Sequence, residues 1–73
     1  MMTKFPRISG NQMTRYLQRK GFVITQRKGS HMTLRNNSHV TVVPTGNKKL
    51  KIKTQLSILL YAGIDKKEFI NDY

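Results

Sequence analysis

Apolar residues recur with a helical period in the N-terminal part of the chain. They lie three and four residues apart, at Met13, Tyr16 and Leu17, which places them on one face of a helix. Ser9 opens an S-x-x-Q pattern, in which two side chains satisfy each other's free backbone amides at a helix start. The pattern predicts a helix over residues 10–20.

Three short segments rich in β-branched and aromatic residues follow Gly21, which suits a left-handed helix end. Turn-forming residues separate these segments, which cover residues 22–27, 31–35 and 39–43. In the second segment, Met32 and Leu34 alternate with polar residues, as in a strand with one buried face. Connections this short favour antiparallel pairing.

Leucine residues dominate the next part of the chain and predict a second helix over residues 54–62. Its buried stripe is expected to consist of Leu56, Leu59, Leu60 and Gly63, and Ile58 and Ala62 add a second apolar row. A D-x-x-E pattern from Asp65 predicts a short third helix over residues 66–71. The order α-β-β-β-α-α indicates one α+β domain over residues 1–73, with a three-stranded antiparallel sheet and helices packed on one face.

Charge is distributed unevenly along the 73 residues. Fourteen Lys and Arg residues face three acidic residues, which gives a formal net charge of +11. Lys66 and Lys67 follow residue 64, as do all three acids, so residues 1–64 carry twelve basic side chains (14 − 2) and no carboxylate. This distribution excludes hydrolases that use a carboxylate pair and magnesium sites built on carboxylates. It predicts a polyanionic partner, nucleic acid first.

The composition also predicts the cellular location of the protein and the absence of a cofactor. The chain has no cysteine and no apolar stretch near the roughly 20 residues that span a bilayer. We therefore expect a soluble cytoplasmic protein with no membrane partner. His31 and His39 are too few for a metal site, so no metal or other cofactor is expected.

His31 is the candidate for catalysis. It follows a glycine turn and alternates with Met32 and Leu34, so its imidazole is expected on the exposed face of its strand. The alternative is a surface histidine that only begins a strand, and for His39 a structural role is the expectation. The residues expected to bind RNA around His31 and along the following basic loop are Arg27, Lys28, Ser30, Arg35, Lys48, Lys49 and Lys51.

The absence of carboxylates indicates which reaction is possible. RNA carries its own nucleophile, the 2′-hydroxyl, so proton transfer by a histidine and charge stabilisation by cations can cleave it without a metal. The expected product is a 2′,3′-cyclic phosphate. A carboxylate to orient the imidazole is available only from the C-terminal acids.

Several short motifs, in order, resemble the HicA toxins. These are Gly29-Ser30-His31, Val43-Pro44, Gly46-Asn47-Lys48 and Ala62-Gly63-Ile64. The resemblance implies an mRNA interferase with a fold like that of double-stranded-RNA-binding domains. It also implies that His31 is catalytic, that the substrate is mRNA and that a HicB-type antitoxin holds the toxin inactive.

The chain departs from the family at one place, and two other functions stay open. Family members often have a histidine two residues after the Val-Pro, where this chain has Gly46. The main alternative is a non-catalytic double-stranded-RNA-binding module. A DNA-binding domain is disfavoured, because neither long helix has the pattern of a basic recognition helix.

Overall fold

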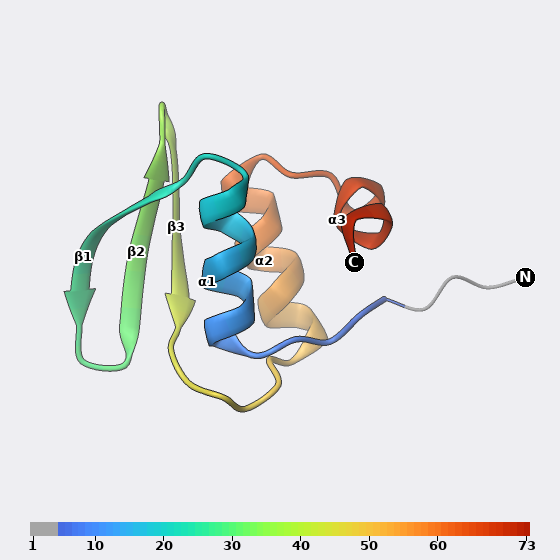
Figure 1. Cartoon of the computed structure of the whole chain (residues 1–73), viewed down its shortest axis with the longest axis horizontal. Helices are drawn as coiled ribbons and strands as arrows, with labels where there is room; N and C mark the ends of the chain where they lie inside the picture. Colours follow the sequence, from blue (N-terminus) through green and yellow to red (C-terminus); the bar gives the residue numbers. More distant parts are fainter. Residues whose placement is uncertain (1–4) are drawn as a thin grey trace, which may run out of the picture.

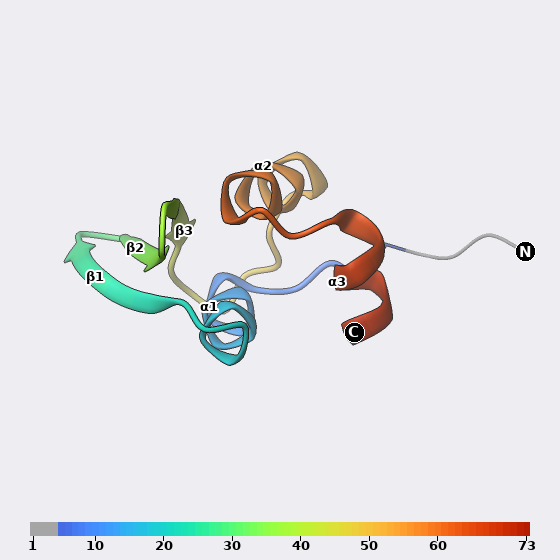
Figure 2. The same ribbon diagram turned by 90° about the horizontal axis from the view of Figure 1, so that it is seen from above.

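Three antiparallel strands form the sheet of this protein, and two helices cover one of its faces (Figures 1 and 2). The computed structural model describes residues 5–73, so Lys4, one of the twelve basic residues counted above, lies outside the described part. The elements are α1 (Gly10–Arg19), β1 (Val23–Lys28), β2 (His31–Asn36), β3 (His39–Pro44), α2 (Ile52–Ala62) and α3 (Lys66–Asp72). The predicted element order and α+β class are confirmed. The extent of the domain, residues 1–73, stays a prediction.

The sheet has two different faces. Its strand order is β1-β2-β3, and His31 of β2 lies opposite Lys28 of β1 and Pro44 of β3. The next residue, Met32, lies opposite Arg27. Directly opposed residues project to the same face and successive residues to opposite faces. Met32 is buried on the side covered by α1 and α2, so His31 and Lys28 belong to the outer face (Figure 2).

The ends of α1 have the predicted capping structures. The Gln12 amide donates to the Ser9 hydroxyl at 3.1 Å, and the Ser9 amide donates to the Gln12 side chain at 2.9 Å. At the other end, Gly21 has a φ of 96° and the Phe22 amide donates to the Leu17 carbonyl at 3.0 Å. This pattern is a Schellman motif, for which glycine is the preferred residue.

The core fills the space between the sheet and the helices and continues toward α3. It includes Met13 and Leu17 of α1, Met32 and Leu34 of β2, and Phe69 of α3. Figure 2 shows α3 beyond α1 and α2, on the side away from the sheet. Residues 5–73 therefore form three layers, and the outer face of the sheet carries no helix.

The buried side of α2 is shifted by one residue from the predicted stripe, although Leu59 and the second row of Ile58 and Ala62 are buried. The residues of α2 that are buried are Gln55, Ile58, Leu59 and Ala62. Leu56 and Leu60 are 38% and 75% exposed. Gln55 takes the buried position because both ends of its side-chain amide are bonded: the oxygen accepts from the Ile8 amide and the nitrogen donates to the Pro6 carbonyl, both at 2.8 Å. A buried amide with both ends paired carries no desolvation penalty that would expel it.

The D-x-x-E pattern before α3 does not form the predicted cap. The Asp65 side chain makes no hydrogen bond to the helix start. The carboxylate of Glu68 turns instead to Lys20 at the end of α1, with 2.7 Å between the charged atoms. A long-range ion pair has replaced the local capping interaction.

Lys20 holds both acidic residues of α3. Its ammonium nitrogen lies 2.7 Å from the carboxylate of Asp72, which also accepts a 2.8 Å hydrogen bond from the Tyr16 hydroxyl. Phe69 packs edge-on against Tyr16, with 5.2 Å between ring centroids. The hydrogen bonds from Lys20 and Tyr16 lower the pKa of Asp72, and burial together with Asp72 raises the pKa of Tyr16.

Replacing Asp72 with Asn should lower the melting temperature at pH 7 and have a smaller effect in acid. Because the pKa of Asp72 is lower in the folded protein than the value near 4 of an unfolded chain, its stabilising contribution is present above about pH 4. That contribution is lost as the pH falls through the folded-state pKa. Thermal unfolding of wild type and Asp72→Asn from pH 7 to pH 2.5 measures the difference. Asp65→Asn is the matched control, and a difference between wild type and Asp72→Asn that does not shrink in acid would contradict the ion pair.

Candidate functional site

His31 is exposed at the start of β2, on the outer face of the sheet. Gly29 and Ser30 form the turn that precedes it, and Gly29 has a φ of 59°. A glycine at the first position suits a type II′ turn, whose twist matches that of the strands. The two-residue turn makes Lys28 the direct cross-strand neighbour of His31, and such neighbours have Cβ atoms about 5 Å apart. The turn therefore pairs a lysine with the histidine on a face open to solvent.

The loop between β3 and α2 is bonded to this turn and to the start of α1. Thr45 donates twice to the Ser30 carbonyl, from its amide at 2.7 Å and from its hydroxyl at 3.1 Å. The Asn11 amide donates to the Gly46 carbonyl at 3.0 Å, and the Gly46 amide donates to the Asn11 side chain at 3.1 Å. Asn11 also donates to the Asn47 side chain at 2.9 Å. Three segments distant in sequence are thus joined.

The start of α1 approaches the end of β3 so closely that it requires glycine. A Cβ atom at Gly10 would overlap the carbonyl oxygen of Pro44, the cross-strand neighbour of His31. Further along the loop, Lys49 pairs with Ser9 in an isolated β-bridge. The backbone of the loop therefore passes the N-terminal end of α1 on its way from β3 to α2.

Six of the predicted site residues lie together at this end of the molecule. We call it the basic end, and it consists of Lys28, Ser30, His31, Lys48, Lys49 and Lys51. All six are exposed. Figure 1 shows the β1–β2 turn, the β3–α2 loop and the first turn of α1 side by side. The arrangement places Lys28 directly opposite the imidazole and the lysines of the β3–α2 loop at the same end of the molecule.

The two predicted arginines do not share the position of these six residues. Arg27 pairs with Met32 and thus faces the helix side, where it lines a hollow with Asn11 and Thr45. Arg35 shares the outer face with His31 but lies four residues further along β2, about 13 Å away. Its guanidinium donates to the Asn37 carbonyl at 3.1 Å. Arg27 is thus close to the turn that carries His31 but on the opposite face of the sheet, and the contact of both arginines with RNA stays a prediction.

The two carboxylates that form ion pairs lie away from the basic end. Glu68 and Asp72 are bound to Lys20, just after the last turn of α1, whereas the basic end adjoins the first turn. A ten-residue helix is about 15 Å long. Among residues 5–73, the ion pairs to carboxylates involve only Lys20. The lysines of the basic end are thus available to an external anion.

His39 lies at the opposite end of β3 from the basic end, and its ring fills the space that a side chain at Gly63 would need. Within residues 5–73, no three His, Cys, Asp or Glu side chains are grouped as a metal site. The helices of that same part are all too short or too polar to cross a bilayer.

Sequence reasoning missed the residues that hold the loop in place. Asn11 and Thr45 make the hydrogen bonds between the three segments, yet asparagine and threonine are common at helix starts and in loops for local reasons. Nothing in the sequence indicates that Asn11 and Thr45 bond to residues far along the chain. The position of Gly10 after a capping serine indicates a helix start but not its close contact with Pro44.

Comparison with known proteins gives one family. A family model described as the HicA toxin of bacterial toxin-antitoxin systems matches residues 10–64, which is most of the chain. The match extends from the first residue of α1 to the residue after Gly63, and it includes His31 and every predicted RNA-binding residue. The comparison with curated proteins finds no match.

Replacing Asn11 with Ala should loosen the basic end. The variant loses the side-chain bonds to Gly46 and Asn47, and two partly exposed hydrogen bonds stabilise a fold by about 1 kcal/mol in total. Urea unfolding measures the change in stability, and amide hydrogen exchange should accelerate at residues 45–47 before the rest of the chain. Asn71→Ala, an exposed asparagine of α3, is the control. Unchanged exchange in the loop would show that Asn11 does not hold it.

Proposed function

Because the chain belongs to the HicA toxin family, it is a toxin of a toxin–antitoxin system with a cognate antitoxin, and we propose that it acts as an RNA endonuclease. The observation that carries this proposal is the pairing of His31 with Lys28 at an exposed end that also bears Lys48, Lys49 and Lys51. A proton-transfer group beside several cations suits a phosphodiester, whose cleavage needs both.

His31 is the group that moves the proton. Its imidazole takes the proton of an RNA 2′-hydroxyl, and the 2′-oxygen attacks the neighbouring phosphorus. The bond from phosphorus to the 5′-oxygen breaks, and the protonated imidazole returns the proton to that oxygen. The products are a 2′,3′-cyclic phosphate and a free 5′-hydroxyl. This step consumes no water and needs no bound metal, which agrees with the absence of metal-binding carboxylates from residues 1–64.

The lysines supply the positive charge. Lys28, opposite His31, stabilises the extra negative charge on the phosphate during attack. Lys48, Lys49 and Lys51 contact the backbone of the strand on either side of the scissile bond, which provides affinity without choice of sequence. Ser30 belongs to the turn beneath the reacting phosphate. Arg27 and Arg35 contact the RNA beyond the basic end, on the two sides of the sheet.

The proposal extends to the substrate and the partner. The substrate is mRNA, because cleavage of messages stops translation in the way expected of an intracellular toxin. The partner is a HicB-type antitoxin, and an acidic surface on it would complement the net charge of +11. Both act in the cytoplasm.

A second function remains possible, the non-catalytic binding of double-stranded RNA. The observation in its favour is the α+β fold with a lysine-rich loop leading into α2, since domains of that kind bind duplex RNA by shape and backbone contacts. The two functions differ in whether His31 is needed.

Replacing His31 with Ala should abolish cleavage and leave binding intact. General acid–base catalysis contributes about 10²–10⁴-fold to a rate, so the rate constant should fall at least about 100-fold. The exposed side chain leaves no cavity, and the melting temperature should stay the same. Gel analysis of a labelled RNA measures cleavage, and its affinity is measured on a 2′-deoxy analogue that binds but stays intact. His39→Ala is the matched control and should cleave.

Three results would contradict this mechanism. They are full activity of His31→Ala, loss of activity in excess EDTA, and cleavage of RNA that is 2′-deoxy at the scissile position. A wild type that binds duplex RNA and never cleaves would favour the binding module instead.

Affinity for RNA should fall linearly on a plot of log affinity against log salt concentration. Each phosphate contact on a single strand contributes a slope of about −0.7, so the single variants Lys48→Ala and Lys49→Ala should each make the slope shallower by about that amount. Fluorescence anisotropy at several salt concentrations measures it. Lys67→Ala on α3 is the control. If Lys67→Ala changed the slope as much as Lys48→Ala, the basic end would not be the RNA-binding surface.

A further inference from the structure

A row of apolar side chains runs along the solvent side of α2. Ile52, Leu56 and Leu60 follow one another at intervals of four residues and are 46%, 38% and 75% exposed. Eight residues of helix cover about 12 Å. We call these three residues the α2 row. Large apolar side chains in a contiguous exposed patch mark an interaction surface more often than scattered ones do.

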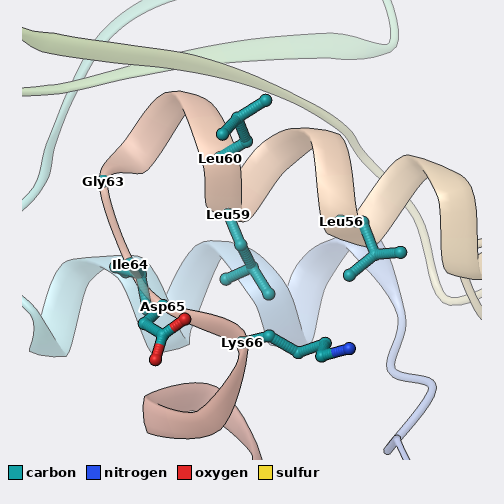
Figure 3. Close-up of a pocket in the computed structure, with 7 residues that line it drawn as sticks. All are labelled: Leu56, Leu59, Leu60, Gly63, Ile64, Asp65 and Lys66. Carbon is teal, nitrogen blue, oxygen red and sulfur yellow. The ribbon is translucent and has the colours of Figure 1, made fainter.

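Each end of the α2 row opens into a hollow. At its C-terminal end, Leu56 and Leu60 line a groove with Ile64 and Lys66, between α2 and the start of α3 (Figure 3). At its N-terminal end, Ile52 lines a second hollow with Phe5, Pro6, Arg7 and Lys49. Lys49 belongs to the basic end, so the row connects that end with the corner between α2 and α3.

The fold itself leaves the α2 row uncovered. α3 is drawn to α1 instead, because Lys20 binds both of its acidic residues and Phe69 packs on Tyr16. The buried side of α2 is fixed by Gln55, which turns Leu56 and Leu60 outward. The leucines of this helix thus exceed what the core of the described chain uses.

The charges around the α2 row are mostly positive. Lys49 and Arg7 adjoin its first hollow, Lys53 follows Ile52 on the helix, and Lys66 lines the second groove. Asp65 is the acidic residue that lines the same groove. The surface therefore suits a partner with an apolar row flanked by carboxylates. A second copy of this chain would bring lysines against lysines, and RNA has no aliphatic groups to fill the hollows.

We propose that an acidic amphipathic segment of the cognate antitoxin docks on the α2 row, with apolar side chains on Ile52, Leu56 and Leu60 and carboxylates toward Lys53 and Lys66. Amphipathic helices bind apolar grooves through anchors at this spacing. The inference rests on the antitoxin partner in the proposed function. It adds that the antitoxin segment binds away from His31, on a surface whose apolar side chains can be replaced without a change in RNA cleavage. A segment seated there also reaches Lys49 and covers part of the basic end.

The test uses the full chain and its cognate antitoxin. The double variant Leu56→Ser/Leu60→Ser removes two of the three apolar side chains of the α2 row without a change of charge. The matched control is Val23→Ser/Val42→Ser, which replaces two apolar side chains of the sheet that are 61% and 48% exposed. Calorimetric titration with purified antitoxin should show about ten-fold or greater weakening for the α2 variant. The control should change by less than about two-fold. Both variants should cleave RNA as wild type does, and only the α2 variant should need excess antitoxin for inhibition.

The outcomes separate this inference from the proposed function. Antitoxin affinity equal to wild type in the α2 variant would overturn the inference, as would equal losses in both double variants. If the chain forms concentration-dependent dimers and Leu56→Ser/Leu60→Ser abolishes them, the partner of the α2 row is a second copy of the chain and the inference is overturned. Selective loss of antitoxin binding in a chain that never cleaves RNA would uphold the inference while the proposed function fails. Circular dichroism spectra and melting temperatures equal to wild type establish that both variants fold.

Discussion

The contact between the first turn of α1 and the end of β3 determines the geometry of the basic end. Gly10 lies against the Pro44 carbonyl so closely that no side chain fits there. Asn11 then fixes Gly46 from the same helix turn, and Thr45 fixes Ser30. A helix in the first third of the chain thereby places a loop from the last half beside the turn that carries His31. Without this contact, the histidine and the loop lysines would belong to independent surface segments.

A second constraint separates the charges. Lys20 collects the carboxylates of Glu68 and Asp72 beyond the last turn of α1, so the acids stabilise the fold at one end while the basic end remains unneutralised. This separation has a cost, since the basic side chains that lack an acidic partner repel one another in a small domain. An acidic partner or RNA relieves that repulsion. The same ion pairs hold α3 against α1 and leave the α2 row open, which connects the charge distribution with the proposed antitoxin surface.

Most of the secondary structure could be predicted from the sequence, because its signals are local. The capping box at Ser9 and the left-handed Gly21 depend on neighbouring residues, and the two-residue turn sets the pairing of Lys28 with His31. That pairing also implies that Arg27 faces the helices, an inference that sequence proximity to His31 obscured. The exposed side of α2 could not be predicted, because Gln55 is buried through partners more than forty residues away. The capping prediction for Asp65 and Glu68 was wrong for the same reason, since Lys20 offered Glu68 a stronger and more distant partner.

The conformation of the loop after β3 explains why this chain has Gly46 where family members often have a histidine. The resemblance places a histidine there in many members, but here the residue has a φ of 128°, a conformation that side chains rarely adopt. Both its amide and its carbonyl are bonded to Asn11. A histidine introduced at this position would either carry backbone strain or break the bonds that hold the loop beside His31. The loop is thus built around glycine, and the reaction proposed above assigns both proton transfers to His31. A mechanism with one histidine sets a geometric requirement, because the imidazole must reach both the 2′-hydroxyl and the 5′-oxygen of the same phosphodiester.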